Sequence, residues 1–244
     1  MSQKILVVSS TANSGKTTVA TNIAAASSTL GDRVGLASAL GNTASRIWSE
    51  KRPAGLPSVL DVRLNEMGPE KCSSSILESL DTLVIDLRYE DFQKWVAFSN
   101  TVIIPVTPDC ITNGDAMNFL ARVLTHKSVQ YSDKKISVVL NKSGPLEAID
   151  GRFKHFLDCI EARPRFSISA LTNYKAALET GKAIFEFGQD AASQTEKFVW
   201  ERLVRSSRKP LPQKTKPMPV QSKRGVRTPP TFKAKDGHQF REVS

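Results

Sequence analysis

The chain has 244 residues, 40% of them hydrophobic, which is enough for one large α/β domain with a buried core. No run of about 18 uninterrupted apolar residues is present, and no charged segment with a cleavage site opens the chain, so we expect a cytoplasmic protein without a membrane partner. The three cysteines are far apart and in no CxxC arrangement, which argues against a disulfide framework or a zinc site.

Positive charge is concentrated at the C-terminus. The whole chain has a formal charge of +10, and the segment from Arg205 to Ser244 contains 11 Lys or Arg against two acidic residues. That segment therefore carries +9, which leaves +1 for everything before it. Because residues 206–244 are also rich in proline and poor in large apolar side chains, we predict a disordered basic tail behind a folded domain at residues 1–205.

The N-terminal segment predicts a strand, a loop and a helix in that order. Residues 4–8 (KILVV) are a short apolar run, SSTANSG is a loop of small polar residues, and residues 16–30 have apolar positions at helical spacing before Gly31. Further strands are predicted at 33–39, 83–87, 101–106, 136–140 and 165–169, and further helices at 76–80, 91–98, 113–126, 147–161, 173–180 and 190–205. This alternation predicts an α/β fold with a doubly wound, mostly parallel sheet.

The loop after the first strand matches most of the phosphate-binding pattern GxxxxGK[ST]. Gly15, Lys16 and Thr17 are in register, and Ser10 stands where the first glycine is expected. In this pattern the loop amides surround the phosphates, the lysine adds positive charge and the hydroxyl ligates magnesium. Asp86, near the end of the strand at 83–87, is the candidate Walker-B carboxylate, although an aspartate that merely caps a strand end is the alternative.

Several segments together resemble one family of nucleotide-binding proteins. TANSGKTTVATNIA is similar to a KGGVGKTT loop with its helix, RVGLASALGNTASRIWSEKR to VLLVDADPQGSALDW, and LVIDL to VVIDTP. TVIIPVTPD is similar to VLIPVQPS, VVLNK to VLNR, and NYKAALETGKAIFEF to YREAFAEGLSVFE. In this order and spacing, across residues 4 to about 204, the chain resembles the ParA/MinD family of P-loop ATPases, and particularly the short ParA proteins of plasmid partition.

The resemblance implies ATP and Mg²⁺ as cofactors, an ATP-dependent homodimer, nonspecific DNA binding in the ATP state and stimulation by a centromere-binding adaptor protein. It also implies Lys16 on the phosphates, Thr17 and Asp86 on magnesium, and Asn141 near the base, with Lys16 and Asp86 as the catalytic residues. The nucleotide-binding residues expected from it are Ser10, Thr11, Ala12, Asn13, Ser14, Gly15, Lys16, Thr17, Thr18 and Asn141.

The chain departs from the family's pattern at positions that serve hydrolysis. The signature lysine falls on Thr11, and the two acidic positions of the second strand fall on Ser38 and Leu40. Such groups stabilise the transition state, so nucleotide binding is better supported than efficient turnover. Arg88, two residues after Asp86, is either a substitute cation at the mouth of the site or a solvated surface arginine.

The predicted tail is an electrostatic binder, because neutralising phosphates releases counterions. The candidate nucleic-acid contacts are Arg208, Lys209, Lys214, Lys216, Lys223, Arg224 and Arg227. A tail that only keeps the protein soluble is the alternative, whereas the absence of an amphipathic apolar face argues against a membrane helix. With DNA as partner, the protein would associate with the nucleoid.

Three functions remain open from the sequence. The first is an ATP-controlled protein of DNA segregation for a plasmid or a similar element. The second is an accessory ATPase of conjugative transfer, and the third is a non-hydrolysing, nucleotide-responsive scaffold whose tail recruits a partner protein. The first is the leading hypothesis, and the lost acidic positions are the strongest argument in the chain for the third.

Overall fold

A computed structural model describes most of the chain before residue 209. The described residues are 2–38, 43–64, 69, 74–112, 114–141, 151, 154–155, 158, 165–168, 173–188 and 191–208. Within them, no helix is long and apolar enough to cross a membrane.

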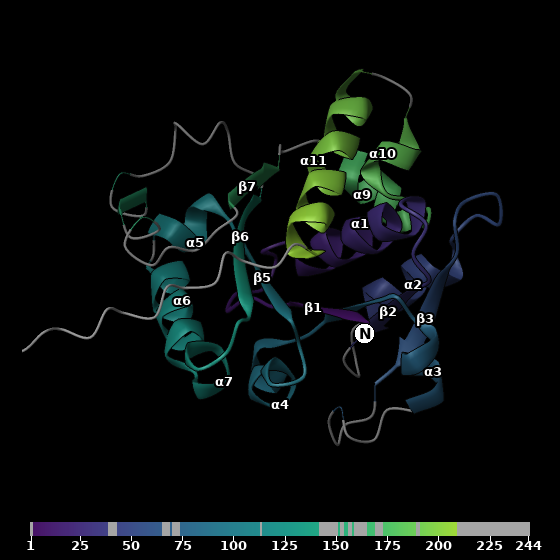
Figure 1. The fold of residues 1–244 in the computed structure, drawn as a ribbon. Coiled ribbons are helices and arrows are strands. Elements are labelled where there is room, and N and C mark those ends of the chain that lie inside the picture. The colour runs from purple at the N-terminus through teal and green to yellow at the C-terminus, as the bar shows by residue number, and fades with distance from the viewer. Residues whose placement is uncertain are drawn as a thin grey trace, which may run out of the picture. The chain divides into compact units, whose positions relative to one another are not determined.

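The described residues form a sheet of seven parallel strands (Figure 1). From one edge to the other the strands are β3 (Val59–Arg63), β2 (Val34–Ser38), β4 (Thr82–Asp86), β1 (Gln3–Val7), β5 (Thr101–Val106), β6 (Lys135–Asn141) and β7 (Arg165–Ile168). β1 lies between β4 and β5, so the order of strands reverses on either side of it. In sheets of this kind, ligands bind at the carboxyl ends of the strands where the order reverses.

Helices cover both faces of the sheet. The helices are α1 (Lys16–Thr29), α2 (Thr43–Glu50), α3 (Ser74–Ser79), α4 (Phe92–Val96), α5 (Pro108–Thr112), α6 (Asp115–Thr125), α7 (Lys127–Gln130), α9 (Asn173–Glu179), α10 (Ile184–Phe187) and α11 (Ala191–Arg208), with a 3-10 turn, η2, at Tyr89–Asp91. Figure 1 shows α1, α9, α10 and α11 together on one side of the sheet, with α4, α6 and α7 on the other.

The alternation of side chains along β1 divides the core into two layers. Ile5 and Val7 pack in the cluster that includes Val19 of α1 and Trp200 of α11. Leu6 and Val8 belong to the opposite cluster, with the aromatic residues of α4 and α6. All four of these β1 residues are fully buried, as expected for a strand covered on both faces.

The six predicted strands are confirmed, each within one residue of its predicted bounds. The fold class is confirmed as well. The prediction was a mostly parallel sheet, and every described strand pair is parallel. The predicted helix at 147–161 lies almost entirely outside the described residues. Elements that the sequence pattern did not predict are β3, α2, α5, α7 and α10.

β3 and α2 escaped prediction because neither has a continuous apolar pattern. β3 reads VLDVR and is an edge strand, with Val59 and Val62 buried but Leu60 49% exposed. α2 reads TASRIWSE, and only Trp48 supplies a large buried apolar side chain because Ile47 is exposed. Such segments are fixed by contacts with the rest of the domain, and sequence periodicity alone does not reveal them.

The end of α11 corrects the predicted boundary at residue 205. The helix continues to Arg208, and Ser207 is buried. Lys135 donates from Nζ to the carbonyls of Ser206 and Ser207 at 3.2 and 3.0 Å, and Gln3 donates from Nε2 to Ser207 at 3.2 Å. Three residues that were predicted to begin the tail therefore belong to the folded domain, while residues 209–244 lie outside the described residues.

Candidate nucleotide-binding site

The loop between β1 and α1 lies at the carboxyl edge of the sheet, next to the ends of β4 and β5. α1 begins at Lys16, and Val19 donates the first helical backbone hydrogen bond back to Gly15 at 2.9 Å. The first amides of a helix have no partner within the helix, and together with the helix dipole they favour an anion. The predicted strand, loop and helix are therefore arranged as a phosphate site requires.

Gly15 gives the loop its shape. Its φ of 87° lies in the left-handed region, as does the φ of 59° at Asn13. A Cβ on Gly15 would lie 1.9 Å from Nδ2 of Asn141, so no larger residue fits without moving that side chain. The glycine is thus required both by its backbone conformation and by close packing.

Asn141, at the end of β6, supports this loop. Its Nδ2 donates to the carbonyl of Ser14 at 2.9 Å, and both residues are buried. The bond explains why an asparagine belongs at this position, since an apolar side chain would leave a buried loop carbonyl without that donor. A role for Asn141 near a base remains a prediction.

Lys16 lies among acidic groups at the mouth of the loop. Its ammonium donates to the carbonyl of Thr11 at 2.9 Å. Burial lowers the pKa of Lys16 below its usual value, and the carboxylates of Asp86 and Glu90 act against that shift. A partly buried cation at the start of a helix, with its side chain folded over the loop, is suited to contact phosphate oxygens.

Thr17 and Asp86 come together as predicted, from the first turn of α1 and the end of β4. Thr17 donates from Oγ1 to Oδ2 of Asp86 at 2.7 Å, and Asp86 is 1% exposed. Magnesium prefers oxygen ligands of these two kinds, commonly one or two carboxylates together with substrate phosphates. The two side chains therefore fit a magnesium ion that is brought with a nucleotide. Among the described residues, no cluster of three His, Cys, Asp or Glu residues forms a separate metal site.

The remaining loop residues differ in their surroundings. Ser10, Ala12 and Asn13 are exposed, while Ser14 is completely buried. The carbonyl of Thr18 accepts hydrogen bonds from Thr21 and Asn22 on the next turn of α1. The structure thus brings Lys16, Thr17, Asp86 and Asn141 around the loop backbone, with the exposed residues on its outer side.

The departures from the family's pattern lie at the same edge of the sheet. Thr11, at the position of the signature lysine, contacts Sγ of Cys110 in α5 through its hydroxyl at 2.9 Å. Ser38 is the neighbour of Asp86 across the β2–β4 pair, so a carboxylate at position 38 would lie beside the Walker-B candidate. Leu40 lies outside the described residues.

Arg88 follows β4 on the surface near the site. Its side chain is 61% exposed, and its guanidinium lies 3.8 Å from the carboxylate of Asp91. This distance is at the outer limit of an ion pair, and exposed pairs hold a side chain weakly. The arginine keeps the freedom to move, and its role as a substitute cation remains a prediction.

Ser45 was not predicted as a site residue. It lies on α2, it is 1% exposed, and it donates from Oγ to Oδ2 of Asp86 at 2.6 Å. No sequence signal marks it, because a serine in TASRIWSE resembles any polar residue of a surface helix. Only the packing of α2 against the sheet brings this hydroxyl to the carboxylate.

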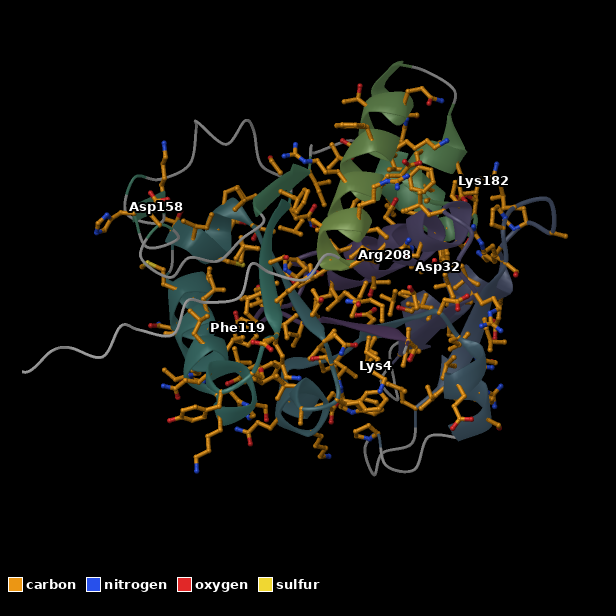
Figure 2. All side chains as sticks on the ribbon, in the orientation of Figure 1. Lys4, Asp32, Phe119, Asp158, Lys182 and Arg208 are labelled. Atoms are coloured by element: carbon orange, nitrogen blue, oxygen red, sulfur yellow. The ribbon has the colours of Figure 1, made fainter. Side chains whose placement is uncertain are left out.

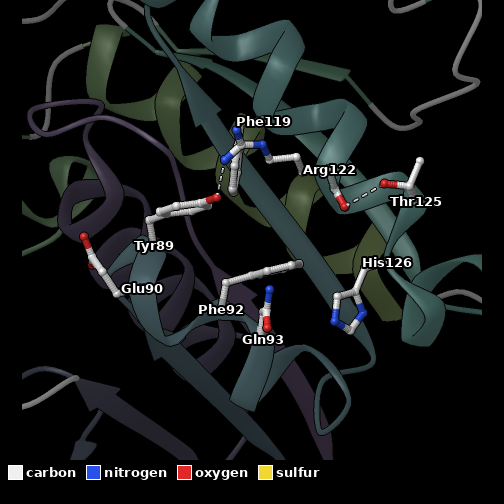
Figure 3. Close-up of a pocket in the computed structure, with 8 residues that line it drawn as sticks. All are labelled: Tyr89, Glu90, Phe92, Gln93, Phe119, Arg122, Thr125 and His126. Carbon is white, nitrogen blue, oxygen red and sulfur yellow. Dashed lines mark hydrogen bonds between the residues drawn. The ribbon is translucent and has the colours of Figure 1, made fainter.

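A cavity of about 490 Å³ lies between η2, α4 and α6 (Figure 3). Its walls include the rings of Tyr89, Phe92 and Phe119, and Tyr89 and Phe119 pack edge to face with 5.4 Å between ring centroids. Arg122 donates from Nη1 to the Tyr89 hydroxyl at 2.7 Å. These contacts hold η2, the segment that follows Asp86, against α6.

Of the predicted nucleic-acid contacts, only Arg208 lies within the described residues. It is the last residue of α11 and forms an ion pair with Asp32. Figure 2 labels the two residues close to each other. Arg208 is therefore partly neutralised by the domain itself. The other candidates, Lys209, Lys214, Lys216, Lys223, Arg224 and Arg227, lie outside the described residues.

The sheet order and the loop define a P-loop nucleotide-binding fold, and solved structures narrow it further. The chain is similar to the cell division protein MinD of Aquifex aeolicus, with 18% sequence identity, a TM-score of 0.64 and coverage of 86% of this chain and 99% of that one. It is also similar to MinD of Pyrococcus horikoshii complexed with Mg-ADP, with 15% identity, a TM-score of 0.61 and coverage of 86% and 97%.

A plasmid partition protein of Borrelia burgdorferi bound to AMPPNP is a third structure of this kind, with 14% identity, a TM-score of 0.55 and coverage of 84% and 99%. No family model and no curated protein sequence matches the chain. The particular fold is that of the MinD and ParA P-loop ATPases, and the predicted resemblance is confirmed at the level of the fold.

Proposed function

We propose that this protein is a ParA-like ATP-binding protein with weak ATPase activity that acts in plasmid or DNA partition through ATP-controlled, nonspecific DNA binding. The observation that carries the proposal is the geometry at the carboxyl edge of the sheet. There the Gly15 loop opens onto the first turn of α1, Lys16 lies at its mouth, and Thr17 is bonded to Asp86 at 2.7 Å.

In this proposal the loop amides and the Lys16 ammonium bind the phosphates of ATP, and Thr17 and Asp86 hold Mg²⁺. The magnesium ion, when bound, neutralises part of the phosphate charge. Proteins of similar fold support the choice of ligand, since they include MinD with Mg-ADP and the plasmid partition protein with AMPPNP. An ATP-dependent homodimer and a centromere-binding adaptor protein belong to the same proposal, as does association with the nucleoid in the cytoplasm.

The expected rate of hydrolysis is low. Thr11 stands where the family's pattern has a cation, and Leu40 stands where it has the carboxylate associated with hydrolysis. The loss of one group that stabilises a transition state commonly slows turnover by about 100-fold or more. Turnover should therefore be measured over hours and at enzyme concentrations close to those of the substrate.

A nucleotide-binding assay tests the proposal directly. Calorimetry should detect ATP binding that is strengthened by magnesium, and Lys16→Ala should weaken it by at least about 100-fold, because it removes a charged partner of the phosphates. Lys175→Ala is the matched control, since Lys175 is 86% exposed on α9 and forms only a loose pair with Glu179. Absence of magnesium-dependent binding to any nucleoside triphosphate would contradict the proposal.

A non-hydrolysing scaffold is the second candidate, and the loss of the acidic residues at positions 38 and 40 favours it. The two functions differ in turnover: a partition protein should hydrolyse ATP faster when DNA and its adaptor are added, whereas a scaffold should bind ATP with no turnover in either condition. A conjugative accessory ATPase would share the biochemical properties of the partition protein, and the neighbouring genes would separate those two.

A further inference from the structure

One carboxylate oxygen of Asp86 accepts hydrogen bonds from two hydroxyl groups. Oδ2 accepts from Thr17 Oγ1 at 2.7 Å and from Ser45 Oγ at 2.6 Å. Asp86 and Ser45 are each only 1% exposed, so water contributes little to the solvation of the carboxylate. Two short hydrogen bonds from different helices fix the carboxylate in one orientation, with Thr17 on α1 and Ser45 on α2.

The other end of α2 is anchored to the loop between α9 and α10. Trp48 is fully buried and donates from Nε1 to the carbonyl of Lys182 at 2.9 Å. Arg52, just beyond the helix, forms a 2.8 Å ion pair with Glu186 in which both side chains are at most 6% exposed. Gly181 packs so closely that a Cβ there would lie 2.4 Å from the backbone of Lys51.

α2 is therefore held at both ends, by Asp86 at one and by the α9–α10 loop at the other. A buried ion pair and a fully buried indole make the second attachment rigid, because breaking either leaves a buried polar group without its partner. The hydroxyl of Ser45 is then presented to Asp86 by a fixed helix rather than by a mobile loop. A rigid support of this kind is what orients a metal ligand precisely enough to bind.

We propose that Ser45 is a positioning residue of the magnesium site, which acts through Asp86 and makes α2 sensitive to the state of that carboxylate. The inference rests on the proposed function, since it assumes that Asp86 serves a nucleotide-bound magnesium ion. It adds a residue outside the phosphate loop, in the segment RVGLASALGNTASRIWSEKR, where the family resemblance assigned Ser45 no role.

Ser45→Ala tests the role in metal binding. Supporting groups of metal ligands commonly contribute about 10- to 100-fold to metal affinity. Ser45→Ala should weaken ATP binding in the presence of magnesium by about tenfold or more, and should change ATP affinity in EDTA by less than about twofold. Ser45→Thr, which keeps the hydroxyl, should restore most of the magnesium-dependent affinity.

Ser49→Ala is the matched control on the same helix. Ser49 lies one turn further along α2, and its hydroxyl makes no hydrogen bond within the described residues. It should bind ATP like the parent protein with and without magnesium. Thermal unfolding of all three variants checks that each one folds.

Hydrogen exchange gives a second result that needs no nucleotide. In the protein without ligand, the amides of α2 should exchange several-fold faster in Ser45→Ala than in the parent, because one end of the helix is released, whereas Ser49→Ala should leave them unchanged. Equal exchange in parent and Ser45→Ala would overturn the link between α2 and Asp86.

The outcomes for the two proposals are distinct. If the parent protein binds no magnesium–nucleotide, the proposed function fails. If the parent binds it and Ser45→Ala binds it equally well, the positioning role of Ser45 fails while the proposed function stands. Equal weakening with and without magnesium would show a general structural effect and would also overturn the positioning role.

Discussion

The carboxyl and amino edges of the sheet differ in what their polar groups bind. At the carboxyl edge the chain leaves β1 through a loop with two left-handed residues, Asn13 and Gly15, and gathers Lys16 and Asp86 around it. At the amino edge Lys135 and its neighbours bind the last carbonyls of α11. One edge concentrates groups that suit a ligand, whereas the other satisfies its polar groups within the protein.

The difference has a consequence for control of the tail. The last residues of α11 are fixed at the amino edge, where Gln3 donates to the carbonyl of Ser207 and Asp32 forms an ion pair with Arg208. The phosphate loop lies at the opposite end of β1, a strand of five residues, which corresponds to about 17 Å. The phosphate loop and Arg208 are therefore not in direct contact, and the proposed control of DNA binding by ATP would have to reach Arg208 through the domain or through dimerisation.

The largest effect is expected from Gly15→Ala at the carboxyl edge. The new Cβ would clash with the side chain of Asn141. Alanine would also have to adopt the left-handed backbone conformation of this position, which is unfavourable for it. Each hydrogen bond to a charged phosphate contributes about 1.5 kcal/mol or more, so losing the alignment of two amides should weaken ATP binding by roughly 100-fold, as calorimetry would measure.

Gly31→Ala is the control for that substitution. Gly31 has a φ of 93°, but a Cβ there has no atom within 4 Å. It should lower the free energy of unfolding by about 1 kcal/mol and leave ATP affinity unchanged. ATP affinity in Gly15→Ala equal to that of Gly31→Ala would contradict the loop's role.

Removal of residues 209–244 should give the next largest effect. The protein ending at Arg208 should lose at least about tenfold in nonspecific DNA affinity at roughly 0.1 M salt and keep its ATP affinity, because the tail carries the basic residues and the site lies elsewhere. Binding to DNA of random sequence, followed over a range of salt concentrations, measures this.

A shorter protein ending at Arg205 sharpens the test. It lacks the Ser206 and Ser207 carbonyls that Lys135 binds, so it should unfold at a lower temperature than the protein ending at Arg208. Unchanged DNA affinity after removal of 209–244 would assign DNA binding to the folded domain.

Lys135→Met at the amino edge should affect stability and not binding. Methionine keeps the buried aliphatic length but removes the donor to two helix carbonyls, at an expected cost of about 1 kcal/mol in unfolding free energy. Urea unfolding measures this, with Lys127→Met as a control at an exposed position of α7 that should change stability by less than about 0.5 kcal/mol. A fall in ATP affinity would argue against the independence of the two edges.

The smallest effect is expected at Asp81, also near the amino edge. Hydrogen bonds from the Arg33 side chain and backbone lower the pKa of Asp81 to about 2 from a usual value of 3.8. The pair's contribution is therefore complete above about pH 4 and is lost as the pH falls toward 2. Asp81→Asn should be slightly less stable than the parent at pH 6, and the difference in melting temperature should shrink as the pH falls through 2 and vanish below it. A difference that persists there, or one insensitive to added salt, would rule out this ion pair as its cause.

The carboxyl edge was largely predictable because its chemistry is local in the sequence. Gly15, Lys16 and Thr17 are consecutive, and Asp86 ends an apolar run, so the order of strands and helices was enough to bring them together. Ser45 was not predictable, since its contact with Asp86 joins residues 41 positions apart and depends on how the short helix α2 packs in the folded domain.

The amino edge was harder to predict, because its contacts join residues that are distant in the sequence. A rich content of proline and positive charge predicted the tail, but the same criteria placed Ser206 to Arg208 within it. Their position in α11 depends on donors from Gln3 and Lys135, which are distant in the sequence.

By itself, the sequence determined the alternation of buried strands and helices, the phosphate loop and the charge asymmetry, because apolar periodicity and short motifs depend on near neighbours. Only the tertiary structure decided that Asp86 is shared by Thr17 and Ser45, that Asn141 supports the loop, and that Ser206 to Arg208 belong to α11. Each of these depends on a hydrogen bond between segments that only folding brings together, and a buried polar group takes the partner that the packed chain supplies.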